Sequence, residues 1–315
     1  MSEVTPSSRR PIEDRPVRVV SARLGFLQQI RSIWRSRELL NYMVVSDVKV
    51  KYKESALGIV WSMVAPALTL VIYYLVFGAL LKNGIPHFVI FLFSGLIVWN
   101  FVTNVVIPST SVVVDRQAIV KKVAFPREIL ALSTVGAGLV YFVMQLVVFA
   151  IFMAIFRTAP QWSLLWLVPV ALLGLVIIIG SIGLLLSALN VFLRDIKHLV
   201  EVFMQLWFYL TPIVYSYSRQ VEPSLVHHGL SWLYFLNPVA PAVLTFQRIF
   251  YVHEYVQATT PGHAVLQVIP HWSTMHYLEM NLAVIGVGLV IFAVTMKSLA
   301  DCRATLPRSS NAECH

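Results

Sequence analysis

Basic side chains gather in the stretch of sequence that precedes the first long apolar segment. They are interleaved with apolar residues at helical spacing: Arg31, Ile33, Arg35, Arg37, Leu40, Val44, Val48, Lys49, Lys51 and Lys53. Ammonium and guanidinium groups form strong, charge-assisted hydrogen bonds with phosphate oxygens. The spacing therefore predicts an amphipathic helix over residues 25–56 that lies in the headgroup layer of a membrane, with its basic side chains toward anionic lipid. A basic flank without a helix of its own is the alternative.

Motifs that carry catalytic or nucleotide-binding chemistry are missing from the sequence. It contains no GxxxxGK[ST], so it has no phosphate-cradling loop, and it contains no HExxH, CxxC or GxSxG. An integral-membrane glycosyltransferase would need carboxylates that meet in one cleft, but Glu222, Glu254 and Glu279 are scattered along the sequence. We therefore predict no catalytic residue, no metal site and no cofactor bound by this chain.

Six apolar stretches are long enough to cross a bilayer, since a spanning helix needs roughly 20 apolar residues. We place them at residues 57–81, 88–107, 131–156, 164–193, 199–217 and 280–296. The chain is 58% hydrophobic and only 12% charged, far from the roughly 25% charged residues of a soluble domain. The predicted fold is an all-α integral membrane protein with six transmembrane helices, which occupy residues 57–299.

These apolar stretches lack titratable side chains at mid-depth. Their polar members are neutral: Gln145, Ser181, Ser187 and Asn190. A lipid flippase or transporter driven by an ion gradient needs groups inside the membrane that titrate or coordinate the ion. The sequence therefore disfavours an ion-driven flippase, and we expect the energy for any transport to come from a cytoplasmic partner that docks on the basic loops.

The distribution of basic residues predicts the orientation. Most of the 24 Lys and Arg fall before the first apolar stretch, after the second and fourth, and in the tail. Cytoplasmic segments carry such an excess, so both termini are predicted to be cytoplasmic. The net charge of +9 then reflects topology rather than nucleic-acid binding. Residues 1–24, rich in Pro, Ser and Arg, are predicted to be disordered, and residues 300–315 form a cytoplasmic tail.

Two connecting segments are too long for simple turns. Residues 108–130 mix apolar and charged side chains, and we expect a short cytoplasmic helix around Ser111–Val123 that ends before Pro126. The external segment 218–278 holds two apolar stretches, Leu230–Leu236 and Ala242–Tyr251, that are too short to span. They predict an external re-entrant helix pair that lines a protein-enclosed or wet pathway.

Four stretches in order resemble one family of transport proteins. They are SDVKVKYKESALGIVWSMVAPAL (46–68), SGLIVWNFVTNVV with IVKKVAFPREILALS (94–133), NVFLRDIKHLVEVFMQLWFYLTPIVYS (190–216) and LNPVAPAVLTFQRIF (236–250). Together they resemble the transmembrane subunit of ATP-binding-cassette type-2 polysaccharide exporters, the Wzm-like and teichoic-acid-exporter-like permeases. The resemblance covers roughly residues 30–300.

The resemblance implies a homodimer in the bacterial plasma membrane, paired with two copies of a cytoplasmic ATPase that binds ATP and magnesium. It also implies export of a polyprenyl-pyrophosphate-linked polysaccharide, of which we favour an O-antigen or a galactan. A teichoic acid, a capsule or a non-glycan substrate is the alternative. On this reading the chain is a transporter permease subunit and not an enzyme.

The resemblance also assigns roles to charged residues. Those that would meet the ATPase are Asp115, Arg116, Lys121, Lys122, Phe125, Pro126, Arg127 and Glu128, with a second, smaller contact at Arg194 and Asp195. Those at the cytoplasmic entrance for substrate are Asp47, Lys49, Lys51, Tyr52 and Lys53. Basic groups there suit a pyrophosphate, which offers oxygens to several donors. Attraction to lipid headgroups, solvation or simple helix capping would explain the same charges.

Aromatic residues gather on the second and fifth apolar stretches and in the external segment. The candidates for a glycan channel are Trp99, Phe101, Trp207, Phe208, Tyr209, Tyr215, Trp232 and Tyr234. A sugar polymer could slide along the faces of such rings. Trp and Tyr also concentrate at bilayer interfaces because they are amphipathic, and this explanation stays open for the same residues.

Overall fold

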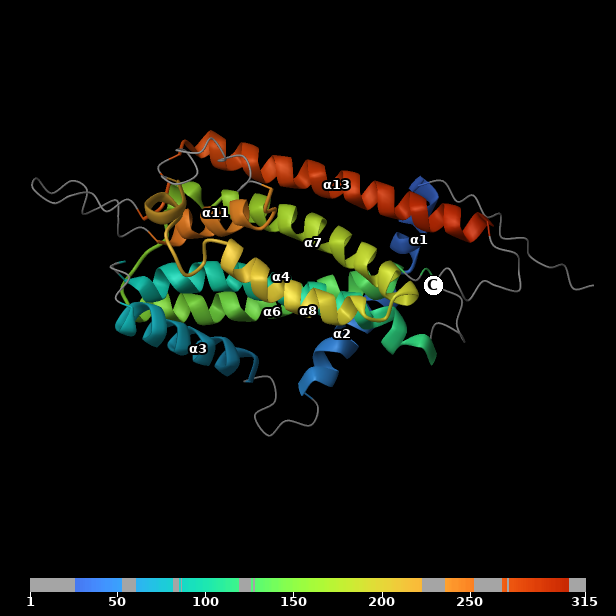
Figure 1. Cartoon of the computed structure of the whole chain (residues 1–315), viewed down its shortest axis with the longest axis horizontal. Helices are drawn as coiled ribbons and strands as arrows, with labels where there is room; N and C mark the ends of the chain where they lie inside the picture. Colours follow the sequence, from blue (N-terminus) through green and yellow to red (C-terminus); the bar gives the residue numbers. More distant parts are fainter. Residues whose placement is uncertain are drawn as a thin grey trace, which may run out of the picture.

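In a computed structural model of the chain, only some of the 315 residues have a placement that can be described. They are residues 26–52, 61–81, 85, 87–118, 126, 128–222, 236–251, 268–270 and 272–305. All the regular elements among these residues are helices (Figure 1). The predicted all-α class is therefore confirmed for the described part of the chain.

Four helices are long and apolar enough to cross a membrane. They are α4 (Phe88–Asp115), α6 (Glu128–Ile155), α7 (Leu167–Phe192) and α13 (Thr274–Thr305, with its apolar part ending at Ser298). They run side by side along the length of the molecule in Figure 1, with α13 packed on α7. The chain is thus an all-α membrane protein whose longest helices form one bundle.

The fifth predicted span is shorter than expected, and the first begins at residues that lie outside the described ones. The first contains α3 (Trp61–Tyr73), which continues as a π-helix, η2 (Tyr74–Leu80). The fifth is α8 (Ile196–Leu210), which has 15 residues, followed by a short π-helix, η4 (Tyr217–Val221). A spanning helix needs about 17–25 residues unless the bilayer adapts to it. Six spanning helices therefore remain a prediction; four single helices among the described residues are long and apolar enough to cross a membrane.

Helix α4 forms the centre of the bundle, because it contacts α6, α7, α8 and α11. Its aromatic residues pack edge to face on neighbouring rings, as in Phe93 on Phe149 and Phe101 on Phe142. The backbones of α4 and α6 approach closely at Gly138 of α6, where an added Cβ would lie 2.4 Å from Val105 of α4. The core depends on this close packing, since a membrane offers no hydrophobic drive between helices.

The connection predicted over residues 108–130 is shorter than expected. Helix α4 continues through Pro108 to Asp115, and α6 already begins at Glu128. We predicted a separate helix around Ser111–Val123 because residues 108–130 mix apolar with charged side chains and are too many for a tight connection between helices. That prediction is wrong for Ser111–Asp115, which belong to α4. After Pro108, the Thr110 Oγ1 donates to the Val106 carbonyl of the preceding turn of α4 at 2.8 Å.

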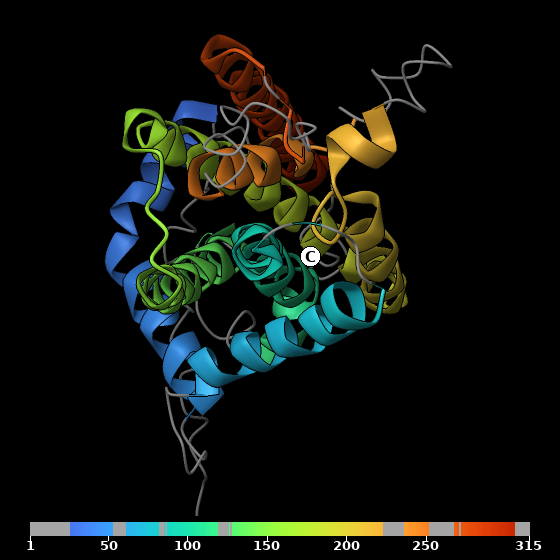
Figure 2. The same cartoon turned by 90° about the vertical axis from the view of Figure 1, so that its left-hand side faces the viewer.

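The predicted amphipathic segment is two helices, α1 (Phe26–Arg35) and α2 (Arg37–Tyr52), which meet at Ser36. Seen along the bundle in Figure 2, they curve around one flank of the long helices. Their apolar sides contact protein: α1 packs against α13 and α2 against α6. Residues 1–25 and 53–60, which carry part of this prediction, lie outside the described residues.

The segment predicted to be external contributes α11 (Ala240–Phe250), which coincides in sequence with the second apolar stretch, Ala242–Tyr251. It lies among α4, α7 and α13, and nearly all of its side chains are buried (Figure 1). The first predicted member, Leu230–Leu236, falls almost wholly outside the described residues. A 3₁₀ turn, η3 (Trp162–Leu164), connects α6 to α7, and the Gln161 N–H donates to the Ile249 carbonyl of α11 at 2.8 Å.

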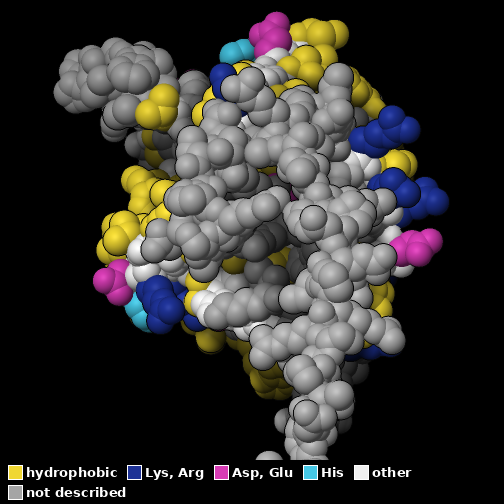
Figure 3. All heavy atoms as spheres, turned by 90° about the vertical axis from the view of Figure 1, so that its right-hand side faces the viewer, with side chains coloured by type: hydrophobic (Ala, Val, Ile, Leu, Met, Phe, Trp, Pro, Cys, Tyr) yellow, Lys and Arg dark blue, Asp and Glu magenta, His cyan; other side chains and the backbone are white. Residues whose placement is uncertain are grey.

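Helix α1 and the last turns of α13 lie at the same end of the bundle, on the right in Figure 1. Figure 3 shows this end, with Lys and Arg side chains along its rim. We call it the basic end, and it also holds Arg116 and the α7–α8 turn. Such a concentration of positive charge is what the sequence predicts for the cytoplasmic side.

Candidate functional site

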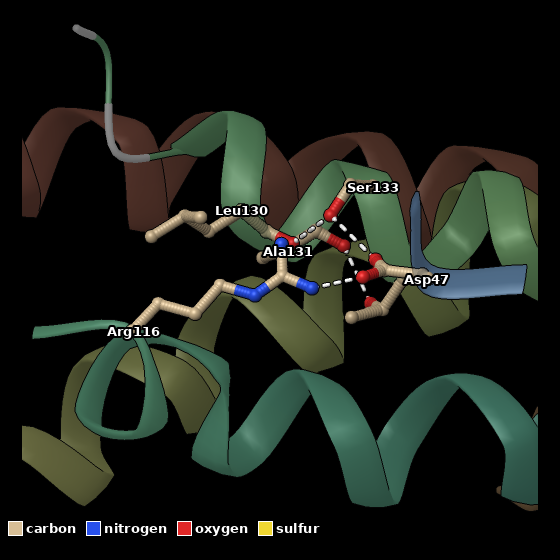
Figure 4. A network of polar contacts seen from close by, with 6 residues as sticks. Asp47, Arg116, Leu130, Ala131 and Ser133 are labelled. Carbon is tan, nitrogen blue, oxygen red and sulfur yellow. Dashed lines mark hydrogen bonds and ion pairs between the residues drawn. The ribbon is translucent and has the colours of Figure 1, made fainter. Parts of the chain in front are cut away.

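Three helices meet in one polar contact at the basic end (Figure 4). The Arg116 guanidinium, directly after α4, forms an ion pair with the Asp47 carboxylate of α2. The Ser133 hydroxyl of α6 donates to the other carboxylate oxygen at 3.2 Å. We call this contact the α2 junction. It joins a residue predicted at the substrate entrance to one predicted to face the ATPase, so Arg116 points inward along the bundle.

Acidic residues flank the junction at the ends of α4 and α6. The Ser111 hydroxyl donates to the Asp115 carboxylate at 2.7 Å, one turn apart on α4. Asp115 is otherwise exposed, whereas the Glu128 side chain in the first turn of α6 is only 4% accessible. A helix N-terminus stabilises negative charge, which suits a carboxylate at that position. Of the two, Asp115 alone is placed to meet a docking partner.

Lys51 extends from α2 toward the interior of the bundle. Its ammonium donates to the Asn104 Oδ1 of α4 at 3.2 Å and lies 4.3 Å from the centroid of the Tyr141 ring of α6. Asn104 precedes Arg116 by about three helical turns. Burial lowers the pKa of the Lys51 ammonium below the usual lysine value. Lys51 as a whole residue is still exposed, as is Lys49 two residues earlier.

Apolar contacts hold α2 against α6 beside the junction. Met43 packs with Val112, Ile129 and Leu130 in a small buried cluster that joins α2, α4 and α6. An added Cβ on Gly136 would lie 2.5 Å from a Val44 methyl, so the α6 backbone is within contact distance of α2. A shift of α4 or α6 at this end must therefore move α2 as well.

Several residues predicted to contact the ATPase lie outside the described residues: Lys121, Lys122, Phe125 and Arg127. Pro126 is half-buried, and Arg194 and Asp195 are exposed in the turn that joins α7 to α8. At the predicted entrance, Lys53 and the side chain of Tyr52 are likewise not described. The coupling and entrance roles of all these residues stay predictions.

The aromatic residues predicted to line a glycan channel are mostly enclosed within the subunit. Trp99, Trp207 and Phe208 are each less than 9% accessible, and Trp99 contacts both other rings edge to face. Phe101 is buried at 1%, and Tyr215 is half-buried, whereas Tyr209 is 58% exposed. Trp232 and Tyr234 lie outside the described residues. A glycan channel stays a prediction, and Tyr209 has the most accessible described ring among its candidates.

A second polar contact lies at the opposite end, where neutral side chains join α8 to the start of α11. The Trp207 indole N–H donates to the Asn237 Oδ1 at 2.8 Å, and the Asn237 amide donates to the Thr211 Oγ1 at 2.9 Å. The Val239 N–H also donates to the Asn237 Oδ1, at 3.1 Å. We call these bonds the Asn237 contact. Close by, the buried Gln247 amide donates to the Pro212 carbonyl at 2.8 Å.

Sequence reasoning missed the residues that complete these contacts. Ser133, Asn104, Tyr141 and Asn237 were not assigned a role, since single polar residues in apolar stretches carry no motif. A signal was available for Asn104: it lies one turn from Asn100, whose amide donates to the Gln145 Oε1 of α6 at 3.2 Å. Polar residues at i and i+4 mark one helix face.

Comparisons with known proteins agree with the motifs. The family model described as ABC-2 type transporter matches residues 38–251, which include both sides of the α2 junction. A protein from Klebsiella pneumoniae named O-antigen export system permease protein RfbA is 31% identical over 213 residues, covering 68% of this chain and 80% of its own length. One of the same name from Myxococcus xanthus is 30% identical over 254 residues, or 80% of this chain and 96% of that protein. The chain therefore belongs to the ABC-2 type transporter family.

Proposed function

We propose that this chain is the channel-forming subunit of an exporter that carries a polyprenyl-pyrophosphate-linked polysaccharide, of the O-antigen or galactan type, across the bacterial inner membrane. Two copies would form the channel and would pair with two copies of a separate ATPase, which holds the ATP and magnesium. Both termini would lie in the cytoplasm. The chief support is that two relatives named O-antigen export permeases align with 68% and 80% of this chain.

The α2 junction gives the proposal a mechanical route. ATP binding in the partner would push on the segment after α4, where Arg116 lies. Because Arg116 is paired with Asp47, and α2 packs on α6 at Gly136, the push would reach α2 directly. Helix α2 carries Lys49 and Lys51, the basic groups proposed to receive the pyrophosphate. One ion pair would then link the ATPase cycle to the substrate entrance.

The proposal is tested by depleting the chain in its native host and measuring polyprenyl-linked glycans separately in each leaflet of the inner membrane. We expect a full-length polymer to accumulate on the cytoplasmic side, and its composition then identifies the substrate. A wild-type copy supplied in trans is the control, and it should clear the accumulated polymer. Normal surface glycan without cytoplasmic accumulation would contradict a polysaccharide substrate and point to another substrate.

A further inference from the structure

An apolar groove of about 840 Å³ lies along α8, between this helix and α4, α7 and the residues before α11. Its floor includes Val106 of α4 and the buried Val200, Met204 and Trp207 of α8. Its rim is formed by exposed apolar side chains: Leu199, Phe203, Leu210 and Leu236. The volume lies within the range of about 300–1,000 Å³ that is typical of ligand pockets. An occupant must be long and apolar.

The groove is separate from the outward face of α8. Val202, Leu206 and Tyr209 are 60%, 61% and 58% exposed, and none of them lines the groove. Residues that lie three or four positions apart on a helix share one face, so these three form an apolar face of their own. A second copy of the chain could pack on that outward face and leave the groove free.

The two ends of the groove differ in chemistry. At the basic end it begins at Ile196, beside the exposed Arg194 and the half-buried Lys197. Lys197 precedes Val200 by one turn on the same side of α8, so its ammonium can meet an anionic headgroup at the mouth. At the other end the groove closes on Asn237 and Pro238. Charge and shape together fit a lipid with one phosphate-type head and a long chain.

The length of the groove discriminates between lipids. Its lining residues on α8 run from Ile196 to Leu210, the whole 15-residue helix, or about 22 Å at 1.5 Å per residue. One leaflet of a bilayer is about 15 Å thick, half of the roughly 30 Å hydrocarbon core. A chain with its head at Lys197 that fills the groove would therefore cross the bilayer centre, which an ordinary phospholipid chain does only when it is almost fully extended and a polyprenyl chain does with length to spare.

We propose that this groove binds the polyprenyl tail of the exported lipid, with its phosphate at Lys197. This inference rests on the proposed function and adds to it a second site for the same lipid, on α8, which would hold the phosphate at Lys197 after the basic residues of α2 have first received it. The tail would remain on one subunit while the sugar chain advances. Lys197 would hold the head near the basic end, and the Asn237 contact would close the far end of the groove.

The test measures which lipid the purified full-length chain retains in nanodiscs. A long-chain polyprenyl phosphate competes with phosphatidylglycerol, and native mass spectrometry counts each bound lipid. Leu186→Trp fills the groove, and Leu185→Trp places the same bulk at a neighbouring position that is 39% exposed and outside the lining. We expect wild type and Leu185→Trp to prefer the polyprenyl phosphate at least tenfold and Leu186→Trp to lose that preference. Equal retention by both variants would overturn the inference.

A second pair of variants keeps the test decisive if Leu186→Trp does not fold. Lys197→Gln should weaken binding of polyprenyl phosphate at least fivefold without changing that of the uncharged polyprenol, while Lys297→Gln on exposed α13 should change neither. Equal retention of phosphatidylglycerol by wild type would identify an ordinary bilayer lipid and refute the inference. A switch between monomer and dimer in Leu186→Trp, without lipid loss, would assign the groove to a second copy instead.

The retention assay is independent of export, so the two proposals can fail separately. Depletion could make glycan accumulate on the cytoplasmic side while the purified wild-type chain shows no preference for polyprenyl phosphate over phosphatidylglycerol. In that case the groove does not bind the polyprenyl tail. If depletion leaves the surface glycan unchanged, the polysaccharide substrate is wrong. The groove then does not bind the tail of an exported glycan lipid, whichever lipid the purified chain retains.

Discussion

The two ends of the helix bundle are joined by different chemistry. At the basic end, an ion pair between Asp47 and Arg116 links α2 to the end of α4, and both side chains keep some access to solvent, 16% and 25%. At the opposite end, neutral groups join α8, α11 and α13 through bonds such as Asn281 Nδ2 to Thr245 Oγ1 at 2.9 Å. Asn281 and Thr245 are at most 1% accessible.

This difference indicates where the subunit can move. An ion pair that keeps access to solvent can open and let water or another charge replace the partner, whereas removing one partner by mutation leaves the other charge without a counterion. A buried amide has no water available as a substitute, and an unsatisfied buried donor costs about 1–3 kcal/mol. We therefore expect the basic end to rearrange during the ATPase cycle while the Asn237 end serves as a fixed frame.

Breaking the α2 junction should have the largest effect. Asp47→Asn keeps the shape of the side chain but leaves the Arg116 charge without its counterion, and removing one partner of a buried pair costs about 3–5 kcal/mol. We expect about 3 kcal/mol, because this pair is partly exposed, together with at least a tenfold loss of export. Thermal unfolding and leaflet analysis of glycans measure the two losses.

The charge exchange Asp47→Arg with Arg116→Asp is the control for this variant. It restores opposite charges, so we expect it to recover part of the export that either single change abolishes. A double-mutant cycle that gives no coupling between the two positions would show that the ion pair does not link the helices.

Breaking the Asn237 contact should have an intermediate effect, which falls on stability and not on export. Asn237→Leu removes the acceptor of the Trp207 indole N–H and the Val239 N–H. We expect a loss of about 2 kcal/mol of stability, with export per folded molecule unchanged. Ser163→Ala, at an exposed position in η3, is the control. Export that falls much further than the folded fraction would mean that this end also moves.

Separating α2 from α6 should have a smaller effect. Gly136→Ala places a methyl group 2.5 Å from Val44, and overpacking of this kind costs about 1–3 kcal/mol. Gly286→Ala on α13 is the matched control, because an added Cβ there has no neighbour within 4 Å. We expect lower export and a lower unfolding temperature only for Gly136→Ala. Equal behaviour of the two variants would mean that the α2–α6 contact is not tight.

Removing the inner lysine should change stability least. Lys51→Gln loses the contact with the Tyr141 ring and weakens the bond to Asn104, worth about 1 kcal/mol. Lys49→Gln, at the exposed neighbour, should leave the unfolding temperature unchanged. If Lys49, Lys51 and Lys53 receive pyrophosphate, neutralising all three should lower export far more than membrane insertion. Equal losses would favour attraction to anionic lipid.

Much of this architecture follows from patterns in the sequence. Long apolar stretches predict α4, α6, α7 and α13, and four short motifs identify the family. The second predicted span ended at residue 107 because the segment after it mixes apolar with charged side chains, whereas α4 continues through Pro108 to Asp115. The α2 junction could not be predicted, since it joins residues 69 positions apart through an ion pair that no local pattern specifies.

The ATPase cycle should move the basic end of the bundle and leave the Asn237 end fixed. Spin labels at Tyr42 and Arg194, both exposed, report on the basic end, and labels at Leu236 and Met275 report on the other end. Cys302 and Cys314 are replaced by Ser, and pulsed electron paramagnetic resonance then measures the distance within each pair of labels in the assembled transporter. ATP should shift the first distance distribution and leave the second unchanged. A shift of the second with no change in the first would contradict the account.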